Sequence, residues 1–292
     1  MAAARIWIQA ARPKTLPAAL TPVAMGIAIA WRDGHFAALP AAAALVGALL
    51  IQVATNFAND YFDGVKGTDT EERLGPQRVV QAGLVPAAVM KRAFILTFAL
   101  AAVVGAYLVW RAGWPIVVIG LLSILFGVLY TGGPRPLGYM GLGDVLVLIF
   151  FGPVATAGTH FVQALAWSPQ ALVAGLAPGL LGVALLTVNN LRDVEGDRVA
   201  GKHTLAVRFG VRFAKIEFLG SILAAAAVPV VLWAQFDAPA GVLFASAACL
   251  LGVGPMREVA QWQPGRRLST ALAGSGRLLV GFGIAFCIGW VL

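Results

Sequence analysis

The sequence predicts an all-α membrane protein, a polytopic bundle of about nine transmembrane helices with its N-terminus in the cytoplasm. The chain of 292 residues is 60% hydrophobic and only 12% charged, with a mean hydropathy of +0.85. A soluble protein of this length would need far more polar surface. Apolar runs long enough to cross a hydrocarbon core of about 30 Å recur along the whole chain. Lys and Arg gather in alternate loops, which is typical of membrane proteins.

The apolar runs divide the chain into nine expected spans separated by short polar segments. In chain order these are residues 16–31, 37–58, 93–110, 114–130, 143–163, 171–192, 216–235, 239–255 and 272–291. The edges of the fifth, seventh and eighth spans are less sharply marked, so eight spans are also compatible with the sequence. We expect one transmembrane domain over residues 1–292. The arm before the first span, RIWIQAARPK, shows no cleavage site of a signal peptide and suits the membrane interface.

The basic residues set the expected orientation. Of the 21 Lys and Arg residues, all but Arg32 and Arg111 fall in the N-terminal arm, in the loops after spans two, four, six and eight, or at the helix ends beside them. The positive-inside rule therefore places these segments in the cytoplasm and, with nine spans, the C-terminus outside. The formal net charge of +8 follows from topology, which argues against a nucleic-acid partner.

Acidic residues are concentrated in two short windows at expected cytoplasmic helix ends. The windows read NFANDYFDGVKGTDTEERLGPQR and NNLRDVEGDRVAGKH, and together they hold eight of the 13 acidic residues of the chain. These eight are Asp60, Asp63, Asp69, Glu71, Glu72, Asp193, Glu195 and Asp197.

The spacing within each window places polar side chains on one face of a helix. Asn56, then Asn59 or Asp60, then Asp63 follow one another at steps of three or four residues. The second window repeats this pattern with Asn189 or Asn190, Asp193 and Asp197. Glu71, Glu72 and Glu195 fall off these faces, and we expect them to be surface charges.

Two such faces turned toward each other would form an acidic bowl at the cytoplasmic end of the bundle. Carboxylates gathered there repel one another, so a cation should neutralise them, and Mg²⁺ is the natural candidate for oxygen ligands. Basic side chains interleaved with the acids suit the oxygens of a diphosphate. They are Lys66, Arg73, Arg78, Arg192, Arg198 and Lys202. A single Asp-x-x-Asp at a helix end is usually just solvated; two matched clusters favour a metal–diphosphate site.

A third polar stretch, YTGGPRPLGYMGLGD, follows the fourth span on the same side. Irregular backbone of this kind is tolerated beside a membrane where it is buried or lines a wet cavity. The basic Arg135 indicates that this stretch lies at the same cytoplasmic end of the bundle. Tyr130 and Tyr139 either contact an aromatic substrate or anchor the chain in the interface. Asp144 also lies on this side, and the pattern does not indicate a role for it.

The remaining candidates favour packing or topology over chemistry. His160, at the outer end of the fifth span, and Cys249 and Cys287, inside spans without metal-ligand spacing, are expected to be packing residues. Arg208, Arg212 and Lys215 most simply serve topology. For His203, beside Lys202, the sequence does not decide between packing and chemistry.

The acidic windows also suggest an internal symmetry. Asp60 precedes Asp193 by 133 positions, and Asp63 precedes Asp197 by 134. We therefore expect two weakly related halves, about 1–142 and 143–292, each giving one acidic face to the site.

Four long blocks resemble the UbiA superfamily of intramembrane prenyltransferases, and more narrowly its 1,4-dihydroxy-2-naphthoate polyprenyltransferases of menaquinone synthesis. The blocks are ARPKTLPAALTPV at 11–23, NFANDYFDGVKGTDTEERLGPQR at 56–78, YTGGPRPLGYMGLGDV at 130–145 and NNLRDVEGDRVAGKHTLAVRFG at 189–210. The last third of the chain matches only as apolar helices. The blocks are specific because of their length; a bare NDxxD would not be.

The resemblance implies a nine-helix bundle around a central cavity, two Mg²⁺ ions and a polyprenyl diphosphate donor. It implies attack by the ring carbon of the naphthoate that bears the carboxylate, loss of carbon dioxide, and a demethylmenaquinone product. It places the site on the cytoplasmic side of a bacterial inner membrane. By this resemblance Asn59, Asp60 and Asp63 form a first motif. Asp193 and Asp197 form a second.

The expected site residues follow from the motifs and the interleaved cations. The catalytic and metal-binding carboxylates are Asp60, Asp63, Asp193 and Asp197. Many superfamily members carry a further Asp where this chain has Gly67, so Asp69, the nearest acid, is added as a metal ligand. The expected substrate-binding residues are Asn59, Lys66, Arg73, Arg78, Tyr130, Arg135, Tyr139, Asn190, Arg192 and Lys202. Membrane lipid is an expected partner, nucleic acid is not, and the sequence does not predict an oligomeric state.

Three alternatives differ in chemistry. A prenyltransferase acting on 4-hydroxybenzoate would share the diphosphate half of the site. A CDP-alcohol phosphotransferase also begins its motif D-x-x-D-G, as at Asp60, Asp63 and Gly64, but this chain has Lys66 and Gly67 where that motif continues with Ala-Arg. A transporter would place its acids in the middle of spans rather than at helix ends.

Overall fold

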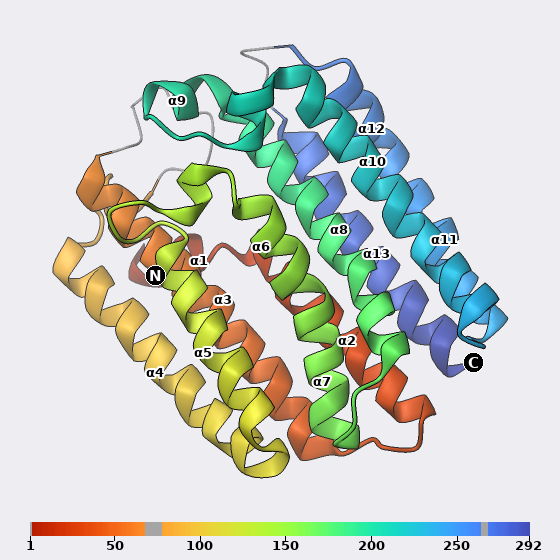
Figure 1. Ribbon diagram of the computed structural model, residues 1–292. Helices are drawn as coiled ribbons and strands as arrows, with labels where there is room; N and C mark the ends of the chain where they lie inside the picture. Colours follow the sequence, from red (N-terminus) through yellow and green to blue (C-terminus); the bar gives the residue numbers. More distant parts are fainter. Residues whose placement is uncertain (1, 68–77, 264–267) are drawn as a thin grey trace.

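The computed structural model describes residues 2–67, 78–263 and 268–292, and over these ranges the chain is helical with no strand (Figure 1). The first half contains α1 (Ala2–Ala11), η1 (Pro13–Thr15), α2 (Leu16–Arg32), α3 (Ala38–Lys66), α4 (Ala87–Ala112), α5 (Trp114–Leu129) and η2 (Leu137–Met140). The second half contains α6 (Gly143–Ile149), η3 (Phe150–Val154), α7 (Ala155–Ala164), α8 (Pro169–Arg192), α9 (Val194–Val199), α10 (Leu205–Gln235), η4 (Ala240–Val242), α11 (Leu243–Ala248), η5 (Cys249–Gly252), α12 (Val253–Ala260) and α13 (Ser269–Val291).

The helices have the lengths that a membrane bundle needs. Within the described residues, eight helical segments are long and apolar enough to cross a bilayer, and the apolar α5, with 16 residues, is shorter. Together with α5, the described part of the chain contains nine apolar helical segments, one for each run in the sequence. The protein is an integral membrane protein whose fold class is the one expected from composition.

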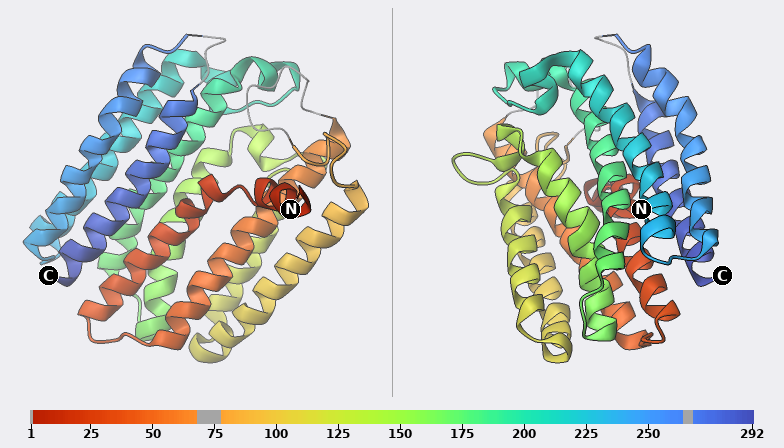
Figure 2. Two further views of the ribbon diagram at one scale, coloured as in Figure 1. Left: turned by 180° about the vertical axis from the view of Figure 1, so that it is seen from behind. Right: turned by 45° about the vertical axis from the view of Figure 1, so that its right-hand side comes forward.

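The long helices run side by side and their connections meet at two opposite ends of the bundle (Figures 1 and 2). We call the end that carries the C-termini of α3 and α8 and the loop 130–143 the motif end. Arg32 and Arg111, the two cations expected on the other side, lie at the opposite end. There Arg32 donates to the Trp290 carbonyl (2.9 Å) and Arg111 to the Gln163 carbonyl (3.4 Å).

The buried apolar residues form one large and two smaller clusters. The large cluster belongs to α8, α10, α13 and their neighbours, and α2 adds Met25 and Ile29 to it. The smaller clusters belong mainly to α1 to α5. The two acidic windows therefore stand on two differently packed parts of the bundle, one on α3 and one on α8.

The predicted span 143–163 is interrupted, and the interruption fits a close contact with α8. Gly152 leaves helical geometry (φ −123°, ψ −114°), and Pro153 cannot donate a backbone hydrogen bond there. Gly179 of α8 lies so near that an added Cβ would approach the Leu148 carbonyl oxygen to 2.4 Å. Small residues at such a crossing let helix backbones approach one another in a membrane.

Several boundaries also differ from the sequence prediction. α3 continues to Lys66 rather than ending at 58, and α4 begins at Ala87 rather than 93. α10 begins at Leu205, eleven residues before the predicted 216, with a kink at Gly210. Apolar runs mark only the hydrocarbon-embedded part of a helix, so polar turns beyond it escape the pattern.

Candidate functional site

The first acidic motif lies on the last turns of α3, which are more buried than a solvated helix end would be. Asn59 is 9% exposed, Asp60 2% and Asp63 1%. Because α3 continues through the motif, the three side chains project from one rigid helix. Gly67 ends that helix with a left-handed backbone (φ +61°), and its N–H donates to the Asp63 carbonyl.

Asp60 holds the segment that returns to α4. Its carboxylate accepts hydrogen bonds from the backbone N–H groups of Val79 (3.3 Å) and Val80 (2.9 Å). Gly64, one turn further along α3, makes this approach possible, since a Cβ there would lie 2.8 Å from the Val80 Cβ. Asp60 therefore has a structural task in addition to any catalytic one.

Asp63 lies at the centre of the polar contacts at the motif end. Arg78 forms an ion pair with its carboxylate, and the Tyr139 hydroxyl donates a hydrogen bond to it. Arg78 also donates to the Asn59 carbonyl (3.2 Å). Burial of both Arg78 (7% exposed) and Asp63 makes this ion pair more consequential than a surface pair.

The loop after α5 is tied to the first motif by a residue that the sequence pattern missed. Thr131 donates from its hydroxyl to the Asn59 side-chain oxygen (2.8 Å). Lys66 donates to the carbonyls of Thr131 (2.9 Å) and Gly133 (3.2 Å). Thr131 follows Tyr130 in the polar stretch, but nothing in its type or spacing distinguishes it from a loop residue.

The second motif is built at the junction of α8 and α9 rather than on one continuous helix. α8 ends at Arg192, Asp193 has non-helical geometry, and α9 begins at Val194. The Asp197 N–H still donates to the Asp193 carbonyl (2.8 Å), so a helical turn relates the two acids. The expectation of one helical face through 189–197 is corrected here: the helix breaks at Asp193.

Each acid of the second motif contacts a cation that the sequence pattern had singled out. Arg192 binds both carboxylate oxygens of Asp193, through Nε (2.7 Å) and Nη2 (2.6 Å). The Lys202 ammonium lies 3.5 Å from Asp197 Oδ1. Such bidentate and charge-assisted pairs orient the carboxylates toward the motif end.

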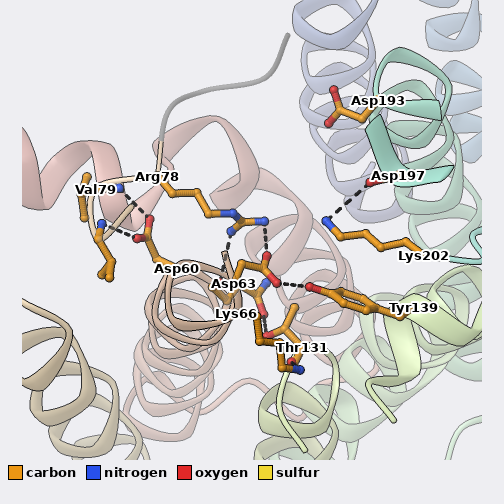
Figure 3. Close-up of polar contacts among 12 residues, drawn as sticks. Asp60, Asp63, Lys66, Arg78, Val79, Thr131, Tyr139, Asp193, Asp197 and Lys202 are labelled. Atoms are coloured by element: carbon orange, nitrogen blue, oxygen red, sulfur yellow. Dashed lines mark hydrogen bonds and ion pairs between the residues drawn. The ribbon is translucent and has the colours of Figure 1, made fainter. Parts of the chain in front are cut away.

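Tyr139 lies between the two motifs (Figure 3). Its hydroxyl contacts Asp63, and its ring centroid lies 5.3 Å from the Lys66 ammonium and 5.0 Å from that of Lys202. Its carbonyl accepts from the His203 N–H (2.7 Å). The structure thus brings the third polar stretch to the same place as both acidic windows.

An apolar cavity of about 520 Å³ lies below this polar layer. It is lined by α2 to α7, and its walls are mostly Ala, Gly, Val, Leu, Ile and Phe. Gln52, Thr55 and Tyr130 line it on the side of the motifs, whereas Leu108 and Ile116 line it toward the opposite end. A volume of this size is ordinary for a small-molecule pocket.

The other candidate residues are dispersed around this layer. Tyr130 lies against Gly143, where an added Cβ would be 2.9 Å from the phenolic oxygen. Asp144 is buried, and its Oδ1 has no hydrogen-bond partner among the residues that the structure describes. Arg135 has an exposed side chain and Asn190 a half-buried one. The predicted Asp69 and Arg73, with Glu71 and Glu72, lie outside the described residues.

Residues set aside in the sequence lie where packing or solvent was expected. Glu195 is exposed, as predicted. His160 is buried at the opposite end, where its Nε2 lies 2.9 Å from Asp33 Oδ2. Cys249 is buried and Cys287 half-buried, and both thiols are free.

Asn56 contacts the N-terminal arm, donating to the Ala11 carbonyl (2.9 Å), so it takes no part in the acidic face.

The donor set suits a magnesium ion that shares its ligands with phosphate. Among the described residues no three His, Cys, Asp or Glu side chains converge on a single metal position. Mg²⁺ is commonly held by one or two carboxylates, with water and phosphate oxygens completing its octahedron. Asp63 in the first motif, and Asp193 and Asp197 in the second, provide such carboxylates.

Comparisons with known proteins agree with this arrangement. The family model "UbiA prenyltransferase family" matches residues 19–274. The chain is 44% identical over 210 residues (70% of this chain, 68% of the relative) to the 1,4-dihydroxy-2-naphthoate octaprenyltransferase of Escherichia coli. It is 36% identical over 287 residues (98% and 96%) to the enzyme of that name from Mycobacterium tuberculosis. A solved UbiA homolog from Archaeoglobus fulgidus bound to GPP and Mg²⁺ superposes with a TM-score of 0.71 at 16% identity, covering 98% of this chain and 99% of that one.

Proposed function

Because the chain belongs to the UbiA prenyltransferase family, we propose that it transfers a polyprenyl group from a polyprenyl diphosphate to 1,4-dihydroxy-2-naphthoate. The observation that carries the proposal is the place of the two acid–cation sets, at the end of the bundle on whose side Gln52, Thr55 and Tyr130 line an apolar cavity. A polyprenyl diphosphate has the same division: an apolar tail joined to a doubly phosphorylated head. The names of the relatives support the naphthoate as acceptor.

The donor is oriented by the contrast between the apolar cavity and the charged motif end. The tail lies among the apolar walls, where burying hydrocarbon contributes about 0.8 kcal/mol per CH₂. The diphosphate then reaches the motif end, within range of Arg78, Arg192 and Lys202. Tyr130, which lines the cavity on the side of the motifs, would lie near the first isoprene unit, where the bond to oxygen breaks.

A pair of Mg²⁺ ions, proposed because the site has two acidic motifs, would supply neutralising charge to the departing diphosphate. The residues of the chain provide the remainder of the electrostatic stabilisation. Guanidinium and ammonium groups fixed around the diphosphate favour the charge that develops on it as the allylic C–O bond breaks. The apolar walls below exclude water, which would otherwise capture the allylic cation.

The acceptor is proposed to bind between the polar stretch 130–143 and the second motif. Its ring carbon attacks the allylic carbon, and the electron pair of the C–O bond leaves with the diphosphate. The carboxylate on the attacked carbon leaves as carbon dioxide, and its bonding electrons restore the aromatic ring, giving demethylmenaquinol, the two-electron-reduced form of demethylmenaquinone. Because Lys202 contacts Asp197, we assign Arg135, whose side chain is exposed, to the acceptor carboxylate.

The proposal includes a location. The bacterial relatives and the positive-inside asymmetry support an inner-membrane protein whose motif end faces the cytoplasm, where the charged donor head and the naphthoate are available. The apolar tail enters from the membrane lipid.

The test uses the purified protein in detergent with a polyprenyl diphosphate, Mg²⁺ and either 1,4-dihydroxy-2-naphthoate or 4-hydroxybenzoate. We expect prenylated naphthoate, released diphosphate and carbon dioxide, with no turnover after chelation of the metal. Prenylation of 4-hydroxybenzoate alone would replace the acceptor in the proposal, and no release of diphosphate with either aromatic would reject the proposed transferase activity altogether.

A further inference from the structure

The carboxylates of both motifs are engaged by groups of the chain itself. Asp63 pairs with Arg78, Asp193 with Arg192 and Asp197 with Lys202, while Asp60 accepts from two backbone N–H groups. Three of the four acids thus have a cationic partner. The same cations are the ones whose chemistry suits a diphosphate.

The cations also occupy the space between the two motifs. Figure 3 shows the Arg78 guanidinium and the Lys202 ammonium between Asp60 and Asp63 on one side and Asp193 and Asp197 on the other. Lys202 further lies 5.0 Å from the ring centroid of Tyr139, whose hydroxyl contacts Asp63. A diphosphate bridging the motifs would meet these cations first.

A metal ion and these cations compete for the same oxygens. Both oxygens of Asp193 are bound by Arg192, at 2.7 and 2.6 Å, so a metal ion can bind this carboxylate through the same two lone pairs only after these bonds are given up. Releasing Arg192 or Arg78, each less than 10% exposed, without a new partner would leave a buried charge uncompensated. A diphosphate supplies that partner.

We propose that Arg78, Arg192 and Lys202 exchange partners during binding: each leaves its aspartate for a phosphate oxygen as the metal and the diphosphate enter together. This inference rests on the proposed function. Partner exchange predicts that divalent metal binds weakly when no diphosphate is present. It also couples the two binding events, because the metal displaces the cations from the aspartates and the diphosphate gives the displaced cations new partners. Such coupling is reciprocal and typically changes affinity about 5- to 150-fold.

The experiment measures Mn²⁺, which prefers the same octahedral oxygen ligands as Mg²⁺, by electron paramagnetic resonance on the purified protein in detergent. Dissociation constants are determined with and without geranyl thiolodiphosphate, an unreactive donor analogue. In the unchanged protein the analogue should tighten Mn²⁺ binding by about tenfold or more. In Arg192→Gln, Mn²⁺ alone should bind roughly three- to tenfold tighter, and the analogue should tighten Mn²⁺ binding less than it does in the unchanged protein.

Two controls separate partner exchange from the general field of a nearby charge. Arg192→Lys keeps the charge but cannot bind both oxygens of Asp193, so exchange predicts tighter Mn²⁺ binding, whereas a field effect predicts no change. Arg212→Gln removes an exposed cation of α10 outside the site and should change neither constant. If the Arg192 variants do not fold, the same measurement on Lys202→Gln tests partner exchange at Asp197.

The outcomes are distinguishable. If the unchanged protein binds metal and analogue cooperatively but Arg192→Lys and Lys202→Gln bind Mn²⁺ alone no more tightly, partner exchange is wrong and the proposed function stands. If the analogue does not bind the unchanged protein in the presence of metal, the proposed function itself fails.

Discussion

Asp63 joins the chemistry of the site to its architecture, because the ion pair with Arg78 and the hydrogen bond from Tyr139 both end on its carboxylate. Asp63→Asn keeps the volume but removes the negative charge that a metal ion needs. We expect prenyl transfer to fall by about 100-fold or more, measured as kcat with saturating Mg²⁺. Glu195→Gln, an exposed acid of the second window, should retain full activity; equal losses in both variants would contradict a specific role for Asp63.

Gly64 has a steric task that its place in the D-G dipeptide does not reveal. A Cβ at this position would lie 2.7 Å from Val80 Cγ1, so Gly64→Val must push away the segment that Asp60 holds. We expect a loss of about 1–3 kcal/mol in stability, seen as a lower melting temperature, and a weaker donor affinity. Gly254→Val, where nothing lies within 4 Å of the added Cβ, is the matched control and should melt nearly unchanged.

At this scale the sequence predicted which side chains meet, but not what each one touches. The pairing of Asp197 with Lys202 and the place of Tyr139 beside both motifs agree with the expected grouping. The contacts of Asn56 with the N-terminal arm and of Thr131 with Asn59 could not be foreseen, because they join residues far apart in sequence. Gly67 also has a physical explanation: its left-handed backbone (φ +61°) favours glycine over the aspartate that the resemblance led us to expect there.

The helices around the cavity determine how much tail it can hold. Gly120 of α5 lines the cavity, and an added Cβ there meets nothing within 4 Å. Gly120→Phe should therefore fold normally while its ring takes up space in the cavity. We expect kcat/KM for a long polyprenyl donor to fall at least about tenfold relative to that for geranyl diphosphate.

The control for this change is Gly220→Phe on α10, which also points into open space but outside the cavity. It should leave the ratio of long to short donors unchanged. An unchanged ratio in Gly120→Phe would show that the tail does not lie in this cavity.

The existence of the helices followed from apolar runs, whereas their ends and breaks did not. The run 143–163 contains Gly152 and Pro153, but a proline within a membrane helix does not by itself decide between a bend and a break. The close approach of Gly179 to Leu148, which a single sequence cannot show, accompanies the break. Likewise the cavity results from six helices packed together, and no local pattern predicts its volume.

At the scale of the whole molecule, the two motifs stand on differently packed parts of the bundle and lie at the same end of it. The buried cluster around α8, α10 and α13 carries the second motif, and the clusters around α3 and α4 carry the first. The clusters do not follow the expected halves at about 1–142 and 143–292, since α2 packs into the cluster of α8, α10 and α13 and α7 packs against α2 to α5, so the two halves stay a prediction. A diphosphate bound between the two motifs can therefore take cations from both parts, as proposed for Arg78 and Lys202.

The orientation of the whole bundle can be measured directly. In a background with Cys249→Ser and Cys287→Ser, single cysteines are introduced by Glu195→Cys at the motif end and by Gln235→Cys at the end of α10, both exposed positions. Because basic residues gather at the motif end, we expect it to face the cytoplasm. A membrane-impermeant maleimide added to spheroplasts should then label Gln235→Cys at once.

The Glu195→Cys variant should be labelled only after the membrane is permeabilised, since its thiol would lie on the protected side. Detergent-solubilised samples of both variants control for reactivity, as each thiol should then react fully. Labelling of Glu195→Cys in intact spheroplasts, with protection of Gln235→Cys, would reverse the orientation. The charged donor head and the naphthoate would then have to reach the site from outside. An enzyme whose substrates come from the cytoplasm could not work in that orientation.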